Sequence, residues 1–257
     1  MKKRLLTTIA ALSIAASGVA GTSSELSTRL SVVDQSGGGS STESWDFDYT
    51  YYFKPLVTGG APLNELSFVN RIASLDLDFH TDGYKVYGGE YEYADADSNH
   101  VFRVGYSTVD GSDTDFINAT YGYYIADNTR LSLTLDYSDW SGGHGTVYTV
   151  EYRDLKELAN AGTWFATRAW VSIADMNYHD YASAGVGVNY YLNETTDWGA
   201  SVEYSDGTVG SNLDVVTISL SGNHYFTDTM GLGLEVARNF INGPDSTVYS
   251  VMGKVRF

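Results

Sequence analysis

Acidic side chains recur two residues apart in three neighbouring segments of this 257-residue chain. The pairs are Asp46 and Asp48, Asp76 and Asp78, and Glu90 and Glu92. A spacing of two places both carboxylates of a pair on one face of a β-strand. Ionised groups gathered on one face need water, because burying an unpaired charge is costly. The chemistry that this pattern predicts is electrostatic attraction of cations and hydrated solutes.

The histidines and glycines form no catalytic or cofactor motif. His179, beside Asp180, is the one pair that resembles a barrel-hydrolase constellation, but adjacent strand residues face opposite sides. The aspartate-rich stretches 95–99 and 110–115 lack EF-hand spacing, so a calcium site there is a weak alternative. Gly37 to Gly39 lack the lysine and helix of a phosphate loop. We expect no enzymatic activity, no metal and no cofactor.

The N-terminus has the pattern of a secretory signal peptide. Lys2, Lys3 and Arg4 precede a short apolar run from Leu5 to Ala16 and then small residues. Cleavage after Ala20 divides the chain into a signal peptide, residues 1–20, and a single domain, residues 21–257. An alternative is that these residues form a buried N-terminal helix. The apolar run from Leu5 to Ala16 is too short to span a membrane as a helix, and no later segment holds 18 consecutive apolar residues.

Hydrophobic residues alternate with polar ones along most of the exported chain. Leu131, Leu133 and Leu135, for example, alternate with Ser132 and Thr134. Fourteen such segments are expected, at about 25–33, 44–53, 70–79, 84–93, 99–108, 114–125, 129–138, 145–154, 162–173, 181–192, 196–205, 213–226, 229–240 and 246–257. The stretch 154–161 is ambiguous between strand and short helix. The predicted fold is all-β, a transmembrane antiparallel β-barrel of about 14 strands with short extracellular loops.

Aromatic pairs precede several tight polar turns. Tyr123 and Tyr124, Tyr190 and Tyr191, and Tyr225 and Phe226 each end one segment, and Tyr51 to Phe53 end another. Tyrosine suits a membrane interface, where its ring is apolar and its hydroxyl stays wet. We interpret these aromatics as a girdle at one end of the barrel. With an even number of strands, all four turns fall at the same end, which we assign to the periplasm.

The last nine residues resemble the C-terminal assembly signal of outer-membrane proteins. In this resemblance the signal residues are Tyr249, Val251, Gly253, Val255 and Phe257. Together with 51–55 (YYFKP) and 61–65 (APLNE), the chain resembles the general porin family of Gram-negative outer-membrane β-barrels. The resemblance implies passive diffusion of small hydrophilic solutes, with outer-membrane lipid, lipopolysaccharide and the barrel-assembly machinery as partners. A long extracellular constriction loop is missing, since the longest outer connection is 34–43 and the longest connection overall, 54–69, is periplasmic. This favours a simple wide barrel and leaves the oligomeric state open.

Positions that alternate with the lipid-facing ones are expected to line the pore. They include ten acidic and six basic residues: Asp46, Asp48, Asp76, Asp78, Glu90, Glu92, Asp136, Glu151, Glu203, Glu235, Arg29, Arg103, Arg153, Arg168, Lys254 and Arg256. So many charges require water inside. The acidic excess predicts a weak cation preference, and acidic and basic walls facing each other would create a transverse field. The alternative is that these charges pair and only stabilise the wall.

Composition limits the kinds of partner and of stabilising bond that this protein can have. The formal net charge of −17 argues against a nucleic-acid partner, whose phosphates need clustered Lys and Arg. The absence of cysteine means that the exported fold does without disulfides. The predicted function is a weakly cation-preferring outer-membrane porin. The second hypothesis is a structural barrel or adhesin with a plugged lumen, for which 54–69 is the only spare segment long enough to act as the plug.

Overall fold

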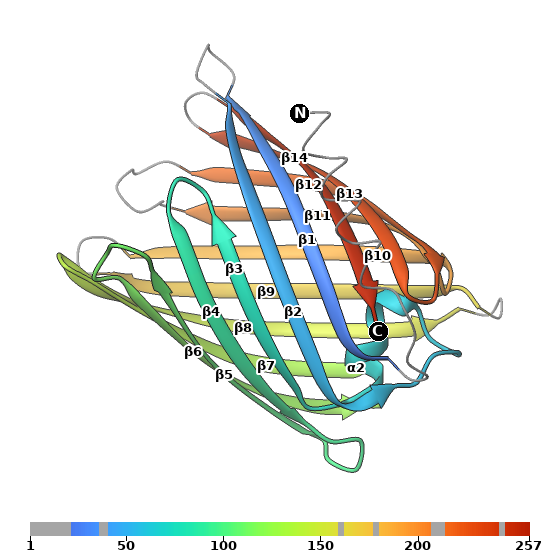
Figure 1. Cartoon of the computed structure of the whole chain (residues 1–257). Coiled ribbons are helices and arrows are strands. Elements are labelled where there is room, and N and C mark those ends of the chain that lie inside the picture. Colours follow the sequence, from blue (N-terminus) through green and yellow to red (C-terminus); the bar gives the residue numbers. More distant parts are fainter. Residues whose placement is uncertain (1–21, 36–40, 159–161, 177–179, 207–213, 242–244) are drawn as a thin grey trace.

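The computed structural model describes residues 22–35, 41–158, 162–176, 180–206, 214–241 and 245–257. The proposed signal peptide, residues 1–20, and His179 lie outside these ranges. The described strands form one closed antiparallel barrel, in which sequence neighbours pair and β1 also pairs with β14 (Figure 1). The predicted fold class and the number of strands are confirmed.

Each predicted segment overlaps one strand of the barrel. The strands are β1 (Thr22–Gln35), β2 (Thr42–Leu56), β3 (Ser74–Thr81), β4 (Lys85–Ala94), β5 (His100–Val109), β6 (Asp115–Ala126), β7 (Thr129–Trp140), β8 (Gly143–Glu157), β9 (Trp164–Met176), β10 (Tyr181–Asn193), β11 (Thr196–Asp206), β12 (Val215–Thr227), β13 (Met230–Ile241) and β14 (Ser246–Arg256). The ambiguous stretch after Asp154 continues as strand to Glu157. Closure pairs every strand on both sides, so the barrel leaves no free edge.

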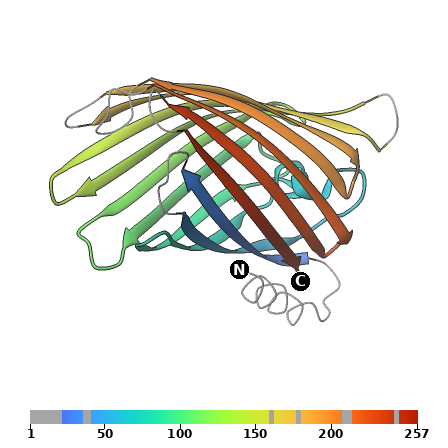
Figure 2. The ribbon, with the colours of Figure 1, turned by 90° about the horizontal axis from the view of Figure 1, so that it is seen from above.

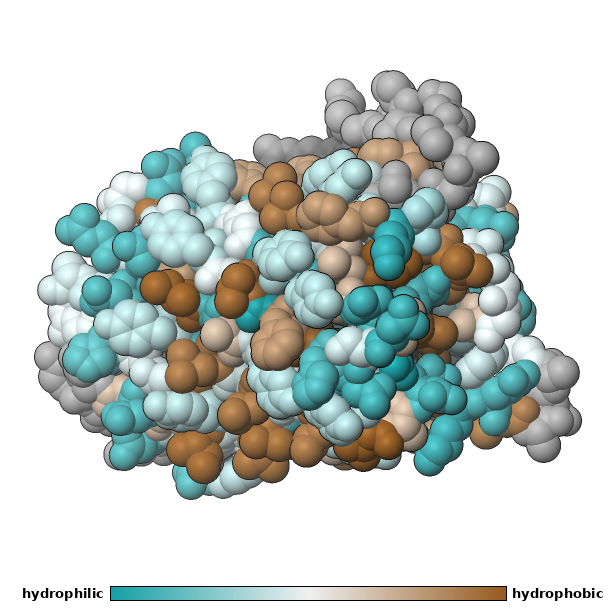
Figure 3. Space-filling model, turned by 90° about the horizontal axis from the view of Figure 1, so that it is seen from below, coloured by the Kyte–Doolittle hydropathy of each residue, from teal (hydrophilic) through white to brown (hydrophobic). Residues whose placement is uncertain are grey.

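The outer surface of the barrel is apolar. In β7, Leu131 and Leu133 are 46% and 51% exposed, whereas Ser132 between them is 6% exposed and faces inward. Brown and pale side chains cover much of the left-centre and lower part of the face seen in Figure 3, and teal side chains form a cluster to the right of its middle. A continuous apolar exterior on a closed barrel needs lipid around it. None of the helices in the described part of the chain is long and apolar enough to cross a membrane.

The connection between β2 and β3 contains two short helical elements, η1 (Leu63–Glu65) and α2 (Leu66–Asn70). Gly59 and Gly60 precede them with φ values of 95° and 78°, which glycine adopts at little cost. The side chain of Asn70 then ties the ends of the loop, because its Oδ1 accepts from the Val57 N–H at 2.8 Å. The chain therefore turns back toward the barrel, and Figure 2 shows α2 enclosed by the strands at one end.

We call residues 57–73 the inner segment. Its apolar side chains enter two clusters within the barrel wall. Leu63 and Leu66 are each 1% exposed and pack with residues of β2 and β12, whereas Phe68 packs with residues of β4, β5, β6, β8, β9 and β10. The end of the barrel that holds this segment also holds Phe257, and it is the end that the strand parity assigned to the periplasm. The expectation of a simple wide barrel is wrong at this end.

Candidate functional site

Glu65 is the buried polar anchor of the inner segment. Its carboxylate is 4% exposed and accepts hydrogen bonds from Arg153 Nη2 of β8 and Tyr191 Oη of β10, both at 2.5 Å. A buried carboxylate is tolerable when a cation and further donors satisfy it. This contact crosses the interior of the barrel, since the inner segment begins and ends on β2 and β3, far from β8 and β10 in the strand order.

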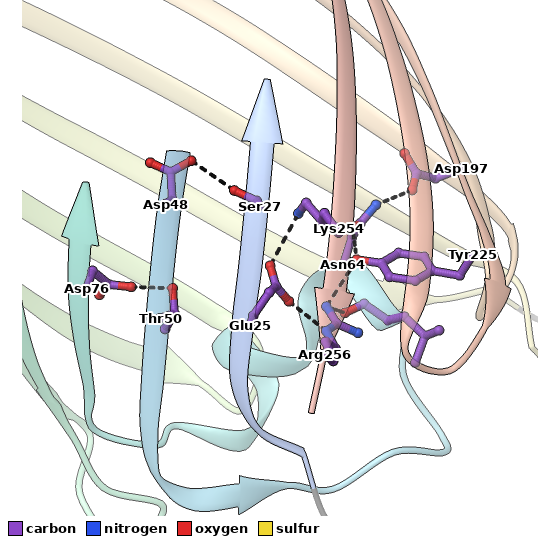
Figure 4. A network of polar contacts seen from close by, with 11 residues as sticks. Glu25, Ser27, Asp48, Thr50, Asn64, Asp76, Asp197, Tyr225, Lys254 and Arg256 are labelled. Atoms are coloured by element: carbon purple, nitrogen blue, oxygen red, sulfur yellow. Dashed lines mark hydrogen bonds and ion pairs between the residues drawn. The ribbon is translucent and has the colours of Figure 1, made fainter. Parts of the chain in front are cut away.

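A second polar anchor involves Asn64 and the seam of the barrel (Figure 4). Asn64 donates to Asp197 Oδ2 at 2.6 Å and accepts from Tyr225 Oη at 2.8 Å. Arg256 donates to the Leu63 carbonyl at 2.8 Å and to Glu25 Oε2 at 2.6 Å. The inner segment is thereby tied to β1, β11, β12 and β14 as well as to β8 and β10.

Arginine side chains also surround the aromatic ring of the inner segment. The guanidinium carbons of Arg153 and Arg130 lie 4.4 and 5.4 Å from the centre of the Phe68 ring. Arg71 lies 3.9 Å from the centre of the Tyr124 ring, and Tyr124 donates to the Phe68 carbonyl at 2.9 Å. Cation–π contacts of this kind strengthen where water is excluded. They add charge-based anchoring to the apolar packing.

The interpretation of these aromatic residues as a membrane girdle is wrong for four of the nine. Tyr52, Tyr124, Tyr191 and Tyr225 are each at most 7% exposed and pack against or hydrogen-bond with the inner segment. Their neighbours Tyr51, Tyr123, Tyr190 and Phe226 are 39–66% exposed on the outside. Adjacent strand residues face opposite sides, so each pair supplies one ring to the membrane and one to the inner segment.

A cavity of about 660 Å³ lies in the lumen beside the inner segment. Seven predicted pore residues line it: Glu90, Glu92, Arg103, Asp136, Glu151, Arg153 and Arg168. Hydroxyl and amide side chains such as Thr134, Ser201 and Asn189 make up much of the remaining wall. At its inner limit the cavity reaches Glu65. Its lining suits water and polar solutes rather than apolar ligands.

The acidic wall of β2, β3 and β4 is partly paired. Arg103 binds both Glu90 at 3.1 Å and Glu92 at 2.6 Å, and Asp46 contacts His80. Hydroxyl groups are the donors to the next two carboxylates: Ser27 donates to Asp48, and Thr50 to Asp76. Asp48 and Asp78 are cross-strand neighbours. Among the described ion pairs none joins a cation to Asp48, Asp76 or Asp78.

Every predicted basic pore residue has a carboxylate partner. Arg29 pairs with Glu235 at 3.7 Å and Arg168 with Glu151 at 2.5 Å, while Lys254 and Arg256 share Glu25. The basic side of the expected transverse field is therefore neutralised locally. Asp136 and Glu203, like the three aspartates of the acidic wall, take part in none of the described ion pairs. Arg130 of the cavity wall has no described ion pair either, but five carboxylates outweigh it, so the uncompensated charge of the lumen is negative.

The C-terminal residues close the seam between β14 and β1. Tyr249, Val251, Gly253, Val255 and Phe257 share the strand face opposite to Ser250, Met252, Lys254 and Arg256. The Phe257 N–H donates to the Ser24 carbonyl at 3.0 Å, and its own carbonyl accepts from Ser24 N–H at 2.9 Å. The Phe257 ring lies 6.4 Å from that of Tyr49. The proposed assembly signal thus coincides with the last pairing of the barrel.

Sequence reasoning missed Glu25, Glu65, Arg130 and Asp197. Glu25 and Asp197 lie at the ends of strands, where the alternation was read as ending. Glu65 and its neighbours lie in the connection between β2 and β3. Local periodicity cannot predict whether such a connection folds into the barrel. Of the described histidines, His100 contacts Tyr121 and His224 contacts Thr196, both within hydrogen-bond distance. No group of three metal-ligating side chains occurs within the described ranges.

No family model matches this chain, and no curated protein matches it. Solved structures do. The crystal structure of the outer membrane protein Omp33 of Acinetobacter baumannii superposes with a TM-score of 0.73 at 16% identity, covering 92% of this chain and 99% of that one. The chain has the fold of an outer-membrane β-barrel.

Two further structures share the fold at lower similarity. A bacterial polysaccharide outer membrane secretin gives a TM-score of 0.58 at 10% identity, covering 93% of this chain and all of that one. A loop-deletion variant of OmpT, an outer membrane protein of Vibrio cholerae, gives 0.51 at 8% identity, covering 91% and 98%. These likenesses agree with the porin-type fold that the family resemblance implied, and at such low identity they concern the fold alone.

Proposed function

We propose that this outer-membrane barrel is a channel for passive diffusion of small hydrophilic solutes, with a weak preference for cations. The observation that carries the proposal is the polar lumen cavity of about 660 Å³, lined by charged, hydroxyl and amide side chains. Carboxylates without a cationic partner at Asp48, Asp76 and Asp78 supply the negative potential. A purely structural barrel has no need of charged groups that must stay hydrated.

The inner segment favours a second candidate, a structural barrel or adhesin whose lumen is plugged. Its contacts with Arg153, Tyr191, Asp197, Tyr225 and Arg256 hold it across the periplasmic end. Under the channel hypothesis, solutes pass beside this segment or after it moves. Under the plugged hypothesis, the cavity is a blind vestibule. The proposed role under both is non-catalytic.

The pore-lining residues and the assembly signal are part of this proposal. Outer-membrane lipid and lipopolysaccharide are the proposed surroundings of the apolar exterior. The barrel-assembly machinery is expected to recognise the C-terminal strand. Small hydrophilic solutes are the proposed cargo. The oligomeric state stays open.

Planar-bilayer recording of the purified protein tests the choice between the two candidates. We expect discrete, ohmic channel openings and, across a potassium chloride gradient, a reversal potential on the cation side. Cold-SDS resistance and heat-modifiable migration of the same sample verify that the barrel is folded. A folded protein that inserts but never conducts would reject the channel and favour the plugged barrel.

A further inference from the structure

Trp170 of β9 is an aromatic side chain that faces the lumen away from the inner segment. On β9, Val171 and Ile173 are exposed on the outside at 54% and 60%, so Trp170 and Ser172 face inward. Trp170 lines the lumen cavity together with charged, hydroxyl and amide groups. A large aromatic ring in a hydrated, polar wall has unfavourable contact with water, which makes its position informative.

The wall next to Trp170 is shaped to receive its ring. Its cross-strand partner on β10 is Gly185, and any Cβ there would collide with the six-membered ring of the indole. The indole therefore lies flat along the wall, over the Gly185 backbone, rather than across the lumen. Gly187, the next inward residue of β10, also lines the cavity and leaves room beside the ring.

Donors and acceptors border this aromatic surface. The guanidinium carbon of Arg168 lies 5.2 Å from the centre of the Trp170 ring, and its Nη2 pairs with Glu151 Oε2 at 2.5 Å. The Arg168 side chain is 60% exposed, so its remaining N–H groups are open to the lumen. The wall thus combines an aromatic ring with a donor group that lies over it and with an acceptor, Glu151, that pairs with this donor.

From this geometry we infer that Trp170, Arg168 and Glu151 form a binding site for neutral ring sugars. A pyranose has an apolar C–H face that stacks on an aromatic ring, and its equatorial hydroxyls need both donors and acceptors. The uncompensated carboxylates of the lumen disfavour sugar acids. The inference rests on the proposed function in one respect, namely that the lumen holds water and admits small solutes.

A second aromatic, outside the cavity lining, faces inward nearer the extracellular end. Tyr181 begins β10 and shares the face of Ser183 and Gly185. Tyr181 lies four positions before Gly185, the cross-strand partner of Trp170, so Tyr181 and Trp170 are staggered along the strands by about 13 Å. A spacing of this size suits an oligosaccharide better than a single sugar.

The test measures sugar binding separately from conduction. Saturation-transfer-difference NMR is recorded on maltose with the full barrel folded in a polyoxyethylene detergent, which has no sugar head group to compete. We expect a saturable maltose signal, no saturable signal with the acyclic polyol mannitol, and an affinity roughly tenfold weaker in Trp170→Ala. Trp170→Phe, which keeps a ring, should fall between.

Trp198→Ala is the matched control, because this tryptophan is 62% exposed on the outer surface. It should bind maltose like the wild type. Equal maltose affinity in Trp170→Ala, or equal binding of mannitol, would overturn the sugar site. Cold-SDS resistance shows whether Trp170→Ala is folded. If it is not, the maltose affinities of the two single variants Trp170→Phe and Arg168→Gln replace it, and wild-type affinity in both would overturn the sugar site. A protein that binds maltose through Trp170 but conducts no ions would reject the channel while leaving the sugar site intact.

Discussion

Two regions of this barrel, its periplasmic end and the middle of its lumen, use the same strand alternation for different purposes. At the periplasmic end, inward residues meet the inner segment, and the pair Glu65–Arg153 has a carboxylate side chain only 5% exposed. Nearer the middle of the lumen, the pair Glu151–Arg168 borders the cavity with an arginine 60% exposed. Alternation thus determines which side chains point inward. Whether such a side chain is shielded from water depends on whether the inner segment or the cavity lies beside it. The following predictions separate the two regions.

Removing Phe257 should have the largest effect, because it takes away the last pairing at the seam of the periplasmic end. The Phe257–Ser24 backbone bonds and the contact of its ring with Tyr49 disappear together. We expect outer-membrane levels to fall sharply in cells, measured by immunoblotting of membrane fractions, while synthesis and export continue. Phe257→Tyr keeps the aromatic terminus and should assemble normally.

Refolding the truncated chain into detergent distinguishes a cellular signal from a structural requirement. If the truncated protein folds in detergent but not in cells, Phe257 acts in recognition by the assembly machinery. Wild-type surface levels without Phe257 would contradict the assembly signal altogether.

Removing the inner segment should change conduction next most strongly. Tyr52 and Ser74 are already cross-strand partners, and the Phe53 N–H donates to the Ala73 carbonyl. A two-residue turn can therefore replace residues 57–71 without moving β2 or β3. We expect single-channel conductance to rise several-fold, because the periplasmic end loses its obstruction. Shortening the opposite loop at 110–114 is the control and should leave conductance near the wild-type value. An unchanged conductance in the deletion would mean that the inner segment does not limit flow.

The two ion pairs give a matched test of dry against wet surroundings. Arg153→Met leaves the Glu65 carboxylate buried without its cation, which costs about 3–5 kcal/mol. If this lost free energy favours release of the inner segment from the barrel wall, amide hydrogen exchange of Leu66–Asn70 should accelerate at least about a hundredfold. Arg168→Met breaks an exposed pair worth about 1 kcal/mol or less and should not change that exchange rate. Adding Glu65→Gln to Arg153→Met should restore part of the protection, and equal exchange in both single variants would contradict the comparison.

The same contrast explains how far the sequence alone reaches. Period-two alternation, turn composition and even parity predicted fourteen strands and placed Asp48, Glu151 and Arg168 on the inner face. They named the 54–69 connection as a possible plug but did not decide whether it enters the barrel, because Glu65 meets Arg153 and Tyr191 only after closure brings β8 and β10 opposite to β2. The aromatic pairs did carry a clue. Adjacent residues such as Tyr190 and Tyr191 cannot both face lipid, so one ring of each pair required an internal partner.

The acidic wall should produce the smallest effect, a modest cation selectivity. The side chains of Asp48, Asp76 and Asp78 have no cationic partner among the described ion pairs, and Asp46 pairs with His80. Replacing all four aspartates with asparagine keeps the shape of the wall and removes its negative charges. We expect the reversal potential across a potassium chloride gradient to move toward the anion side.

Salt and a charge-neutral control make this last prediction decisive. The Debye length is about 10 Å at 0.1 M salt and about 3 Å at 1 M, so the shift should be visible in dilute salt and fade in concentrated salt. Arg29→Gln with Glu235→Gln removes one paired charge of each sign from the lumen and should leave the reversal potential unchanged. A shift of equal size in that double variant would mean that selectivity follows wall geometry rather than net charge. An unchanged potential in the fourfold variant would mean that ions do not pass along β2 and β3.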